Sequence, residues 1–342
     1  MHDPIPLTIL TGFLGSGKTT LLRRAMPAGG IGSRGRLGII VNEFGEVGLD
    51  QDLLVHAADE VEVLAGGCLC CARRGDIAKS LHELIRKARR GGAAWIDEAV
   101  LETSGLADPA PIIATILQDP WLRNNVRLKG VIAVLDALAG PDNLATHEEA
   151  RRQIAIADAV VITKTDLRQA ADVSELRGLI GASVPDARIF ESQDPGFGLA
   201  GVLAALDAET SMPAFASPAN ASESAGHGKD AESFVLALDG LLDWPVFTVW
   251  LSAMLHAHGD RILRVKGRLW ARSTGKPLIV HGVQHMMHPP VHLDARDGEP
   301  RKSWLVFITR GLARTEIEAS LTRFLARAEA GHARPQATVP AF

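Results

Sequence analysis

The sequence predicts an α/β protein, with a P-loop nucleotide-binding domain built on a mostly parallel sheet and a small α+β C-terminal domain. Three observations predict this. Short runs rich in Val, Ile and Leu alternate with helical patterns through roughly the first 200 residues, which is typical of parallel strands covered on both faces. A glycine-rich sequence ending in Gly-Lys-Thr joins the first run to a helical stretch. The composition changes near residue 206, and a second set of apolar runs follows.

The first domain is expected to contain seven strands separated by helices. The strands are predicted at 5–10, 37–41, 60–64, 99–102, 130–136, 159–163 and 187–190. Helical patterns include 76–90, 148–157 and 173–180. Because each strand is followed by a helical stretch, we expect a sheet with helices on both sides.

The second domain is expected after a flexible linker. We place the P-loop domain at 1–206, the linker at 207–233, the C-terminal domain at 234–330 and a tail at 331–342. The linker is rich in Ala, Ser, Pro, Gly and acidic residues and has no apolar period. Strands are predicted at 234–238, 262–271, 277–283 and 304–309, with helices near 245–256 and at 315–328.

Composition narrows the class of partners. The chain has 342 residues, of which 46% are hydrophobic, and a net charge of -4. This balance gives no basic footprint for nucleic acid or for an anionic membrane. No apolar run approaches the roughly 20 residues that span a bilayer, and the N-terminus lacks a signal-peptide pattern. We therefore expect a cytoplasmic protein with neither a nucleic-acid nor a membrane partner.

The glycine-rich sequence fits the phosphate-binding pattern G-x-x-x-x-G-K-[ST] between a strand and a helix. Its backbone N–H groups are expected to wrap the phosphates, because glycines allow the tight loop and the helix N-terminus favours negative charge. Lys18 is expected to reach the β- and γ-phosphates and Thr19 to ligate Mg²⁺. The alternative is a plain glycine-rich turn with a solvated lysine. The predicted nucleotide ligands are Gly12, Gly15, Ser16, Gly17, Lys18, Thr19 and Thr20.

A second motif predicts the base. Thr163, Lys164 and Asp166 lie in Thr-Lys-Thr-Asp at the end of a buried strand, matching the [NT]-K-x-D pattern of GTPases. The aspartate accepts from guanine N1–H and from the exocyclic amine, a donor pair that adenine lacks. The alternative is a polar strand end whose Asp166 caps a helix.

Two further residues are expected near the γ-phosphate. Glu102 ends a predicted strand and Gly105 follows it in Glu-Thr-Ser-Gly. The glutamate can hold Mg²⁺ through water, and the glycine can present its N–H to the phosphate. We count Lys18, Thr19 and Glu102 as the catalytic candidates. A simple strand-to-loop cap is the alternative.

All three cysteines of the chain, Cys68, Cys70 and Cys71, lie within four residues after two glycines. Three clustered thiolates suit a metal such as Zn²⁺ better than a disulfide framework. Buried structural cysteines and redox chemistry are the alternatives. The segment 42–50 is a candidate nucleotide switch, and its Glu46 is a candidate to assist the thiolates or Mg²⁺; an ordinary acidic turn is equally compatible with the pattern.

Taken in order, these motifs resemble the CobW-like GTPases, the metallochaperones related to UreG and HypB, and especially their YjiA-type branch. The resemblance rests on GFLGSGKTT, NEFGEVG, GGCLCC, ETSGLADP and TKTD, and it extends to LRVKG and GVQH in the second domain. It covers the chain except the linker and the tail. Two departures stand out: the linker holds only one histidine, His227, where many members have a histidine-rich insert, and Val41 replaces an acidic residue of some members.

The resemblance implies GTP hydrolysis coupled to the handling of zinc, or of cobalt in some branches, with GTP, Mg²⁺ and Zn²⁺ (or Co²⁺) as the bound species. Cys68, Cys70 and Cys71 would hold the metal for a client metalloprotein. A homo-oligomer is one option for the assembly. Turnover is expected to be slow, because no arginine finger is evident.

Rival functions remain at this point. One is a GTP-dependent interaction switch or assembly factor with structural or redox-active cysteines, and a weaker one is a metabolic kinase on the same fold. His281, His285, His288 and His292 are spaced by three or four residues, but prolines interrupt them, so ordinary histidines are favoured over a second metal or docking site.

Overall fold

The computed structural model describes residues 3–25, 36–41, 61–65, 78–79, 81–83, 85–86, 96–207, 231–295 and 298–332. The chain divides into two compact units, Met1–Ser211 and Met212–Phe342. The linker bounds 207–233 stay a prediction. Each unit has its own sheet and its own apolar core, so each is described by itself.

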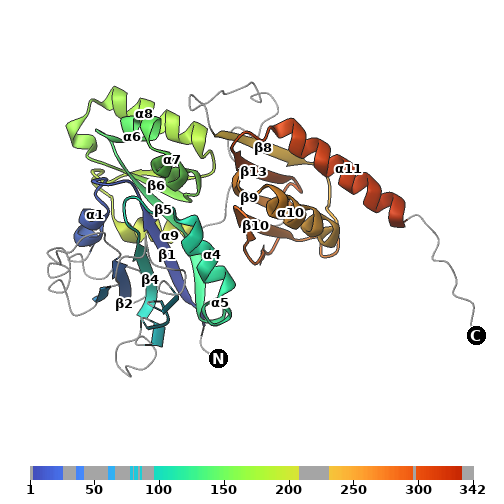
Figure 1. The fold of residues 1–342 in the computed structure, drawn as a ribbon, viewed down its shortest axis with the longest axis horizontal. Coiled ribbons are helices and arrows are strands. Elements are labelled where there is room, and N and C mark those ends of the chain that lie inside the picture. The colour runs from blue at the N-terminus through green and yellow to red at the C-terminus, as the bar shows by residue number, and fades with distance from the viewer. Residues whose placement is uncertain are drawn as a thin grey trace, which may run out of the picture. The chain divides into compact units, whose positions relative to one another are not determined.

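The first unit is built on a seven-stranded parallel sheet (Figure 1). Its order is β3-β2-β4-β1-β5-β6-β7, and every pair is parallel. The strands are β1 (Ile5–Thr11), β2 (Arg36–Val41), β3 (Val61–Ala65), β4 (Ile96–Glu102), β5 (Val126–Asp136), β6 (Ala159–Thr163) and β7 (Arg188–Glu191). The predicted fold class is confirmed. Strand β5 begins at Val126, four residues before the predicted start at 130. The prediction was too short because Arg127 and Lys129 interrupt the apolar run on which it relied.

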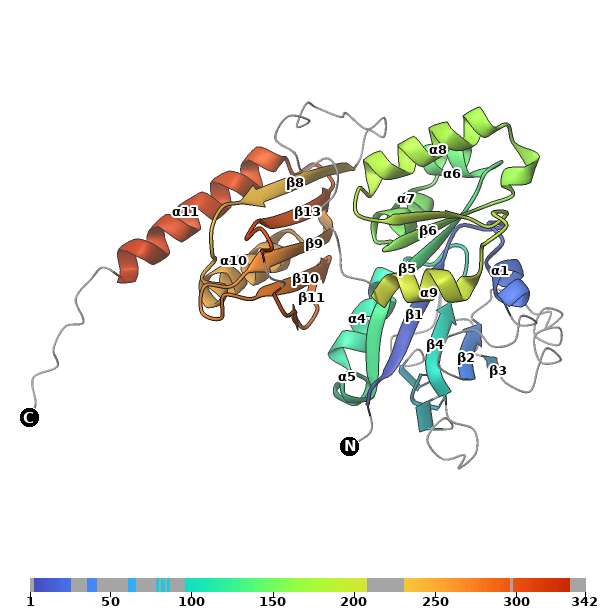
Figure 2. The same ribbon diagram turned by 180° about the vertical axis from the view of Figure 1, so that it is seen from behind.

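Helices cover both faces of this sheet. Leucines of α1 and α9 pack in one cluster with sheet residues such as Leu10, Val134 and Val161, and α9 lies in front of the sheet in Figure 2. Helices α4 and α5 lie on the opposite face (Figure 1). The helices are α1 (Lys18–Ala25), α4 (Ala110–Gln118), α5 (Pro120–Asn125), α6 (Gly140–Thr146), α7 (Glu148–Ala155), α8 (Ala170–Ser183) and α9 (Leu199–Asp207).

The second unit is an antiparallel sheet with two long helices packed on it. The sheet order is β11-β10-β9-β13-β8, and β12 pairs with β10. Side chains of α10 and α11, including Phe247, Leu251 and Ile317, share one core with Val265 and Phe307 of the sheet. The elements are β8 (Glu232–Leu238), α10 (Trp244–His258), β9 (Ile262–Trp270), β10 (Pro277–Val283), β11 (Met286–Met287), β12 (Val291–His292), β13 (Ser303–Thr309) and α11 (Arg314–His332).

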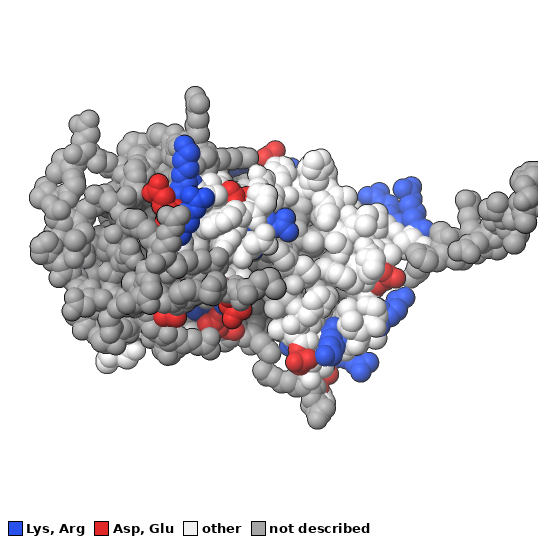
Figure 3. Space-filling view, turned by 90° about the horizontal axis from the view of Figure 1, so that it is seen from below, with Lys and Arg blue, Asp and Glu red and all other residues white. Residues whose placement is uncertain are grey.

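Two surface properties bear on function. Within the described residues, no helix combines the length and the apolar character needed to cross a membrane. On the face shown in Figure 3, the coloured basic and acidic side chains are interspersed rather than gathered by sign.

Candidate nucleotide-binding site

The predicted nucleotide residues lie at one edge of the parallel sheet. Strands β1, β4, β5 and β6 are neighbours in the order β4-β1-β5-β6. Because the strands are parallel, their carboxyl ends meet at the same edge, which is where ligands bind in open α/β sheets. β1 ends at Thr11, directly before the glycine-rich loop, while Glu102, Asp136 and Thr163 are the last residues of the other three strands.

The loop Gly12–Gly17 leaves β1 sharply and enters α1 at Lys18. Gly12 has a φ of 148°, and a Cβ atom there would lie 2.3 Å from the carbonyl oxygen of Val134. No other residue fits at that position. The Ser16 N–H donates to the Phe13 carbonyl oxygen at 3.1 Å. The Ser16 hydroxyl is buried and has no hydrogen-bond partner among the described residues. The loop therefore has a polar group that could bond to a ligand.

Lys18 folds back over the loop. Its ammonium group donates to the carbonyl oxygens of Gly12 at 2.8 Å and of Phe13 at 3.3 Å, and the residue is buried. The charge is therefore held beside the loop, where a phosphate would be placed by the motif. Thr20, by contrast, is exposed on the first turn of α1.

The two magnesium candidates are in contact. The Thr19 hydroxyl donates to Glu102 Oε1 at 2.8 Å, although the residues are far apart in sequence. Glu102 is buried, and Leu10 of β1 lies beside it in register. The next residue, Thr103, donates its hydroxyl to Thr11 at 2.9 Å. Oxygen atoms from β4 and α1 thus lie side by side, and oxygen is the ligand atom that a hard cation prefers.

Gly105 lies against the phosphate-binding loop. A Cβ atom at this position would lie 2.7 Å from the backbone nitrogen of Leu14, so only glycine fits. The turn is closed by the Ala107 N–H, which donates to the Ser104 carbonyl oxygen at 3.0 Å. Gln153 of α7 donates to the carbonyl oxygens of Gly105 and Ala107. Sequence reasoning missed Gln153, because nothing local marks a glutamine that acts across 48 positions.

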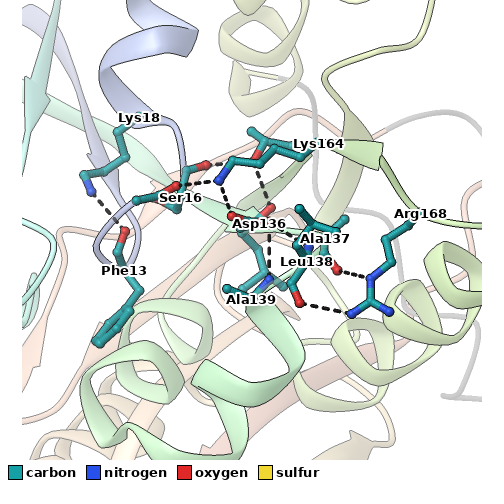
Figure 4. Close-up of polar contacts among 12 residues, drawn as sticks. Phe13, Ser16, Lys18, Asp136, Ala137, Leu138, Ala139, Lys164 and Arg168 are labelled. Carbon is teal, nitrogen blue, oxygen red and sulfur yellow. Dashed lines mark hydrogen bonds and ion pairs between the residues drawn. The ribbon is translucent and has the colours of Figure 1, made fainter. Parts of the chain in front are cut away.

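The base-recognition motif is bonded to the same loop. The Thr163 hydroxyl donates to the Ser16 carbonyl oxygen at 2.7 Å. Lys164 has a left-handed backbone, with φ 59°, and its ammonium group donates to the Gly15 carbonyl oxygen at 3.1 Å. The same ammonium group pairs with the Asp136 carboxylate (Figure 4). The two motifs, far apart in sequence, are therefore one connected structure.

Asp136 is a second site residue that sequence reasoning missed. Its Oδ1 accepts from the backbone N–H groups of Leu138 at 2.7 Å and of Ala139 at 3.4 Å, and the residue is buried. Arg168 holds the same segment by donating to the carbonyl oxygens of Ala137 and Leu138 (Figure 4). The available signal was an aspartate ending a buried apolar strand.

Asp166 is exposed at the rim of this corner. Its Oδ1 accepts from the Gln193 side-chain amide at 2.9 Å, and Gln193 Oε1 accepts in turn from Arg24 at 3.4 Å. The carboxylate remains accessible at the surface, which a base-binding role requires.

The predicted metal ligands lie largely outside the described residues. Cys68, Cys70, Cys71 and Glu46 fall in segments that the structure does not describe. In the second unit, the rings of His281 and His288 stack at 4.3 Å between centroids, and His285 lies 3.2 Å from Asp260. Across the described part of the chain, no three His, Cys, Asp or Glu side chains are grouped to hold a metal ion.

Comparison with known families matches both units. Residues 6–191 match the CobW/HypB/UreG nucleotide-binding domain, and residues 231–325 match the C-terminal domain of the cobalamin synthesis protein CobW.

Individual proteins give the same match. The chain is 32% identical to the zinc chaperone YjiA of Escherichia coli, over 93% of this chain and 98% of that protein. It is 34% identical to the zinc-regulated GTPase metalloprotein activator 1 of Schizosaccharomyces pombe, over 52% of this chain and 43% of that protein. The crystal structure of Zn(II)-bound YjiA GTPase from E. coli superposes with a TM-score of 0.67 at 26% identity, covering 94% of this chain and 99% of that one.

Proposed function

The chain belongs to the CobW/HypB/UreG family of nucleotide-binding proteins and is a GTPase, and we propose that it binds zinc and passes it to a client protein under control of its nucleotide state. Two relatives support the zinc part of this proposal by name, one a zinc chaperone and one a zinc-regulated metalloprotein activator. The site at the sheet edge supplies the chemistry.

The observation that carries the nucleotide-binding part of the proposal is the hydrogen bond from Lys164 to the Gly15 carbonyl oxygen at 3.1 Å. It joins the guanine motif to the phosphate-binding loop, so one connected structure would hold both the base and the phosphates. In this assignment Lys18 holds the β- and γ-phosphates, while Thr163 and Lys164 brace the base corner. Asp166 accepts from guanine, which selects GTP over ATP. The remaining loop residues Gly12, Gly15, Ser16, Gly17 and Thr20 contact phosphate oxygens.

Magnesium fits the same assignment. The Thr19 hydroxyl and the Glu102 carboxylate are oxygen donors 2.8 Å apart at the sheet edge, and oxygen donors are what Mg²⁺ prefers. Thr19 would bind the ion directly and Glu102 would hold it through water. When bound, the ion neutralises charge that develops on the phosphates. The chain's own part is to position the triphosphate with Lys18 and with the N–H of Gly105.

Zinc is the proposed cargo. Strand β3 ends at Ala65, at the same sheet edge as β1 and β4, and the sequence Gly-Gly-Cys-Leu-Cys-Cys follows directly. Cys68, Cys70 and Cys71 would bind the ion as thiolates, which suits Zn²⁺ and also admits Co²⁺. Strand β2 ends at the same edge before the segment with Glu46. Both segments therefore start at the sheet edge that carries the proposed nucleotide site, and we propose that a change in the γ-phosphate reaches them.

The proposed cycle couples these parts. Bound GTP stabilises one arrangement of the segments after β2 and β3 and so sets the affinity of the thiolates for zinc. A client protein docks, and hydrolysis removes the γ-phosphate and lowers that affinity. The coupling must work in both directions, so zinc must also change the affinity for GTP by the same factor.

The test is zinc affinity in three nucleotide states. Zinc binding would be measured by competition with a chromophoric chelator, without nucleotide, with GDP-Mg²⁺ and with a non-hydrolysable GTP analogue. A shift of tenfold or more, about 1.4 kcal/mol of coupling, is expected in the wild type.

Two variants complete this test. The Cys68→Ala, Cys70→Ala, Cys71→Ala triple variant should lose the zinc site, and Lys18→Ala should keep it but lose the nucleotide response. Equal zinc binding by the wild type and the triple variant would refute the cysteine assignment. Zinc affinity that ignores nucleotide would favour an assembly switch with an independent zinc site.

A further inference from the structure

Helix α7 contacts both loops of the nucleotide site. At its start, the His147 ring stacks on Phe13 of the phosphate-binding loop, with centroids 4.5 Å apart. Further along, Arg152 pairs with Asp108 at 3.3 Å, and Gln153 donates to the turn Ser104–Ala107. One helix therefore supports the loop that surrounds the phosphates and the turn proposed to meet the γ-phosphate.

Gln153 makes the most specific of these contacts. It is only 1% exposed, and its amide nitrogen lies 3.1 Å from the Gly105 carbonyl oxygen and 3.0 Å from that of Ala107. Both partners are acceptors, so only the nitrogen can bond to them. The amide oxygen is buried and has no hydrogen-bond partner in the described parts of the chain. Burying an unpaired acceptor is unfavourable, so the side chain is placed for its two donor bonds.

These bonds add to the hold that the phosphate-binding loop has on Gly105. Gly105 lies so close to Leu14 that a Cβ atom would come within 2.7 Å of its backbone nitrogen. The carbonyl group of Gly105 is held by Gln153 of α7. The turn is thus confined between the loop and the helix, and it has little freedom to rotate its peptide groups.

We propose that Gln153 is a positioning residue that holds the Ser104–Ala107 turn in the orientation that distinguishes a nucleoside triphosphate from a diphosphate. The inference rests on the proposed function, in which the Gly105 N–H meets the γ-phosphate. The γ-phosphate is the part of GTP that GDP lacks, so an error in this turn alters binding of the triphosphate and its hydrolysis. In the proposed function the base is bound by Asp166 and the other phosphates by the loop, and Gln153 contacts neither, so we expect those contacts to be unchanged.

The test compares Gln153→Met with the wild type. Methionine keeps the shape but cannot donate to the two carbonyl groups. The affinities for GDP and for a non-hydrolysable GTP analogue would be measured by fluorescence, with steady-state GTP hydrolysis alongside. The ratio of the affinity for the GTP analogue to that for GDP should fall by about five- to tenfold. This is the size expected for losing one hydrogen bond, the one proposed from the Gly105 N–H to the γ-phosphate. kcat should fall too, and the affinity for GDP should stay within about twofold.

A control and a second variant separate positioning from stability. Thr115→Val removes a buried hydroxyl that donates to Pro111 within α4. It should lower the melting temperature and leave the nucleotide preference unchanged. Gln153→Glu places a carboxylate against two carbonyl groups. Because a protonated glutamic acid can donate again, its hydrolysis rate relative to wild type should recover as the pH falls from 8 to 6.

The outcomes are distinct. A Gln153→Met protein that is less stable but keeps the wild-type preference and kcat would overturn the proposal. A Gln153→Glu protein whose hydrolysis rate does not recover at low pH would also count against the proposal. If the Gln153→Met variant does not fold, the Gln153→Glu variant is the test. If the wild type itself neither binds nor hydrolyses GTP, the proposed function fails rather than this inference.

Discussion

The two ends of strand β5 each carry a charged residue whose side chain is buried, Lys129 and Asp136, and the two make different kinds of contact. Near the amino end, Lys129 lies between Glu98 at 2.7 Å and Asp207 at 2.9 Å. These contacts tie β5 to β4 and to the last residue of α9. The Lys129 side chain is only 5% exposed and pairs with two carboxylates. Asp207, which is half exposed, also pairs with Arg127 at 3.8 Å. This end is an ion network.

At the carboxyl end, Asp136 bonds to parts of the proposed nucleotide site. It accepts from two backbone N–H groups of the following segment and pairs with Lys164, which in turn reaches the phosphate-binding loop. The same kind of ion pair thus joins strands and a helix at one end of β5, and at the other end it joins the segments of the proposed nucleotide site. The comparison predicts that stability and nucleotide affinity respond to substitutions at opposite ends.

Lys18→Ala should give the largest loss of nucleotide affinity. Lys18 begins α1 at the sheet edge where β5 has its carboxyl end. Removing one partner of a buried charge contact costs about 2–5 kcal/mol of binding, or a loss of roughly 30- to 5000-fold in affinity for GTP. Stability should change little, because the Lys18 ammonium group donates to carbonyl oxygens of the loop itself, those of Gly12 and Phe13. Isothermal titration with GTP and GDP, with a thermal melt of the same sample, would measure both. A GTP affinity of the variant that stays within a few-fold of wild type would break the comparison at its functional end.

Lys129→Met tests the amino end. It leaves Glu98, which is 16% exposed, without its partner, and breaking a buried pair costs about 3–5 kcal/mol. Because Asp207 is half exposed, we expect about 2–3 kcal/mol of lost unfolding free energy in denaturant titrations. The affinity for GDP should stay within twofold of wild type. A large fall in nucleotide affinity would mean that the two ends are not separate.

Asp136→Asn should give an intermediate effect. The amide keeps an oxygen for the N–H groups of Leu138 and Ala139 but loses the charge that holds Lys164. A charge-assisted hydrogen bond is worth about 1.5–3 kcal/mol, and Lys164 is 38% exposed, which screens it. We therefore expect about a tenfold weaker affinity for GDP in competition with a fluorescent guanine nucleotide. Lys129→Met is the matched control from the other end of β5.

Much of this arrangement could be predicted from the sequence, because it rests on local patterns. The buried strands are near-continuous apolar runs, and the phosphate-binding loop is a contiguous motif between a strand and a helix. The start of β5 could not, since Arg127 and Lys129 break the apolar pattern there, and the interruption is explained only by their partners. Those partners, Glu98 and Asp207, come from distant parts of the chain.

The candidate site divides in the same way. Lys18, Thr19 and Lys164 belong to motifs whose spacing is their signal. Gln153 and Asp136 act through backbone groups of other segments, so their role depends on how α7 and β5 are placed in space. Sequence patterns report periodicity and local spacing, and neither contains that information. Roles that depend on long-range packing therefore have to be read from the fold.

The smallest expected effect is pH dependent and lies on the amino side of β5. Asp119 begins α5, which leads into β5, and it accepts from the N–H groups of Trp121 and Leu122 and contacts His82 at 3.2 Å. Burial raises the pKa of Asp119, but the Leu122 N–H and His82 outweigh this and hold the pKa below its usual 3.8. A lowered pKa in the folded state stabilises the protein above the unfolded value, and this stabilisation is lost as the pH falls through the folded pKa.

Asp119→Asn should therefore cost up to about 1 kcal/mol of unfolding free energy at pH 7, the usual scale for a helix N-cap. The gap between wild type and variant should narrow as the pH falls from 5 to 3, because the amide does not titrate. Denaturant titrations of both proteins over this range would measure the gap, and general acid effects cancel in the difference. In a His82→Ala background the gap at pH 5 should be smaller. A gap that widens on acidification would show that the charge of Asp119 destabilises the folded protein. The hydrogen bonds to Trp121 and Leu122 and the contact with His82 would then not stabilise that charge as the geometry indicates.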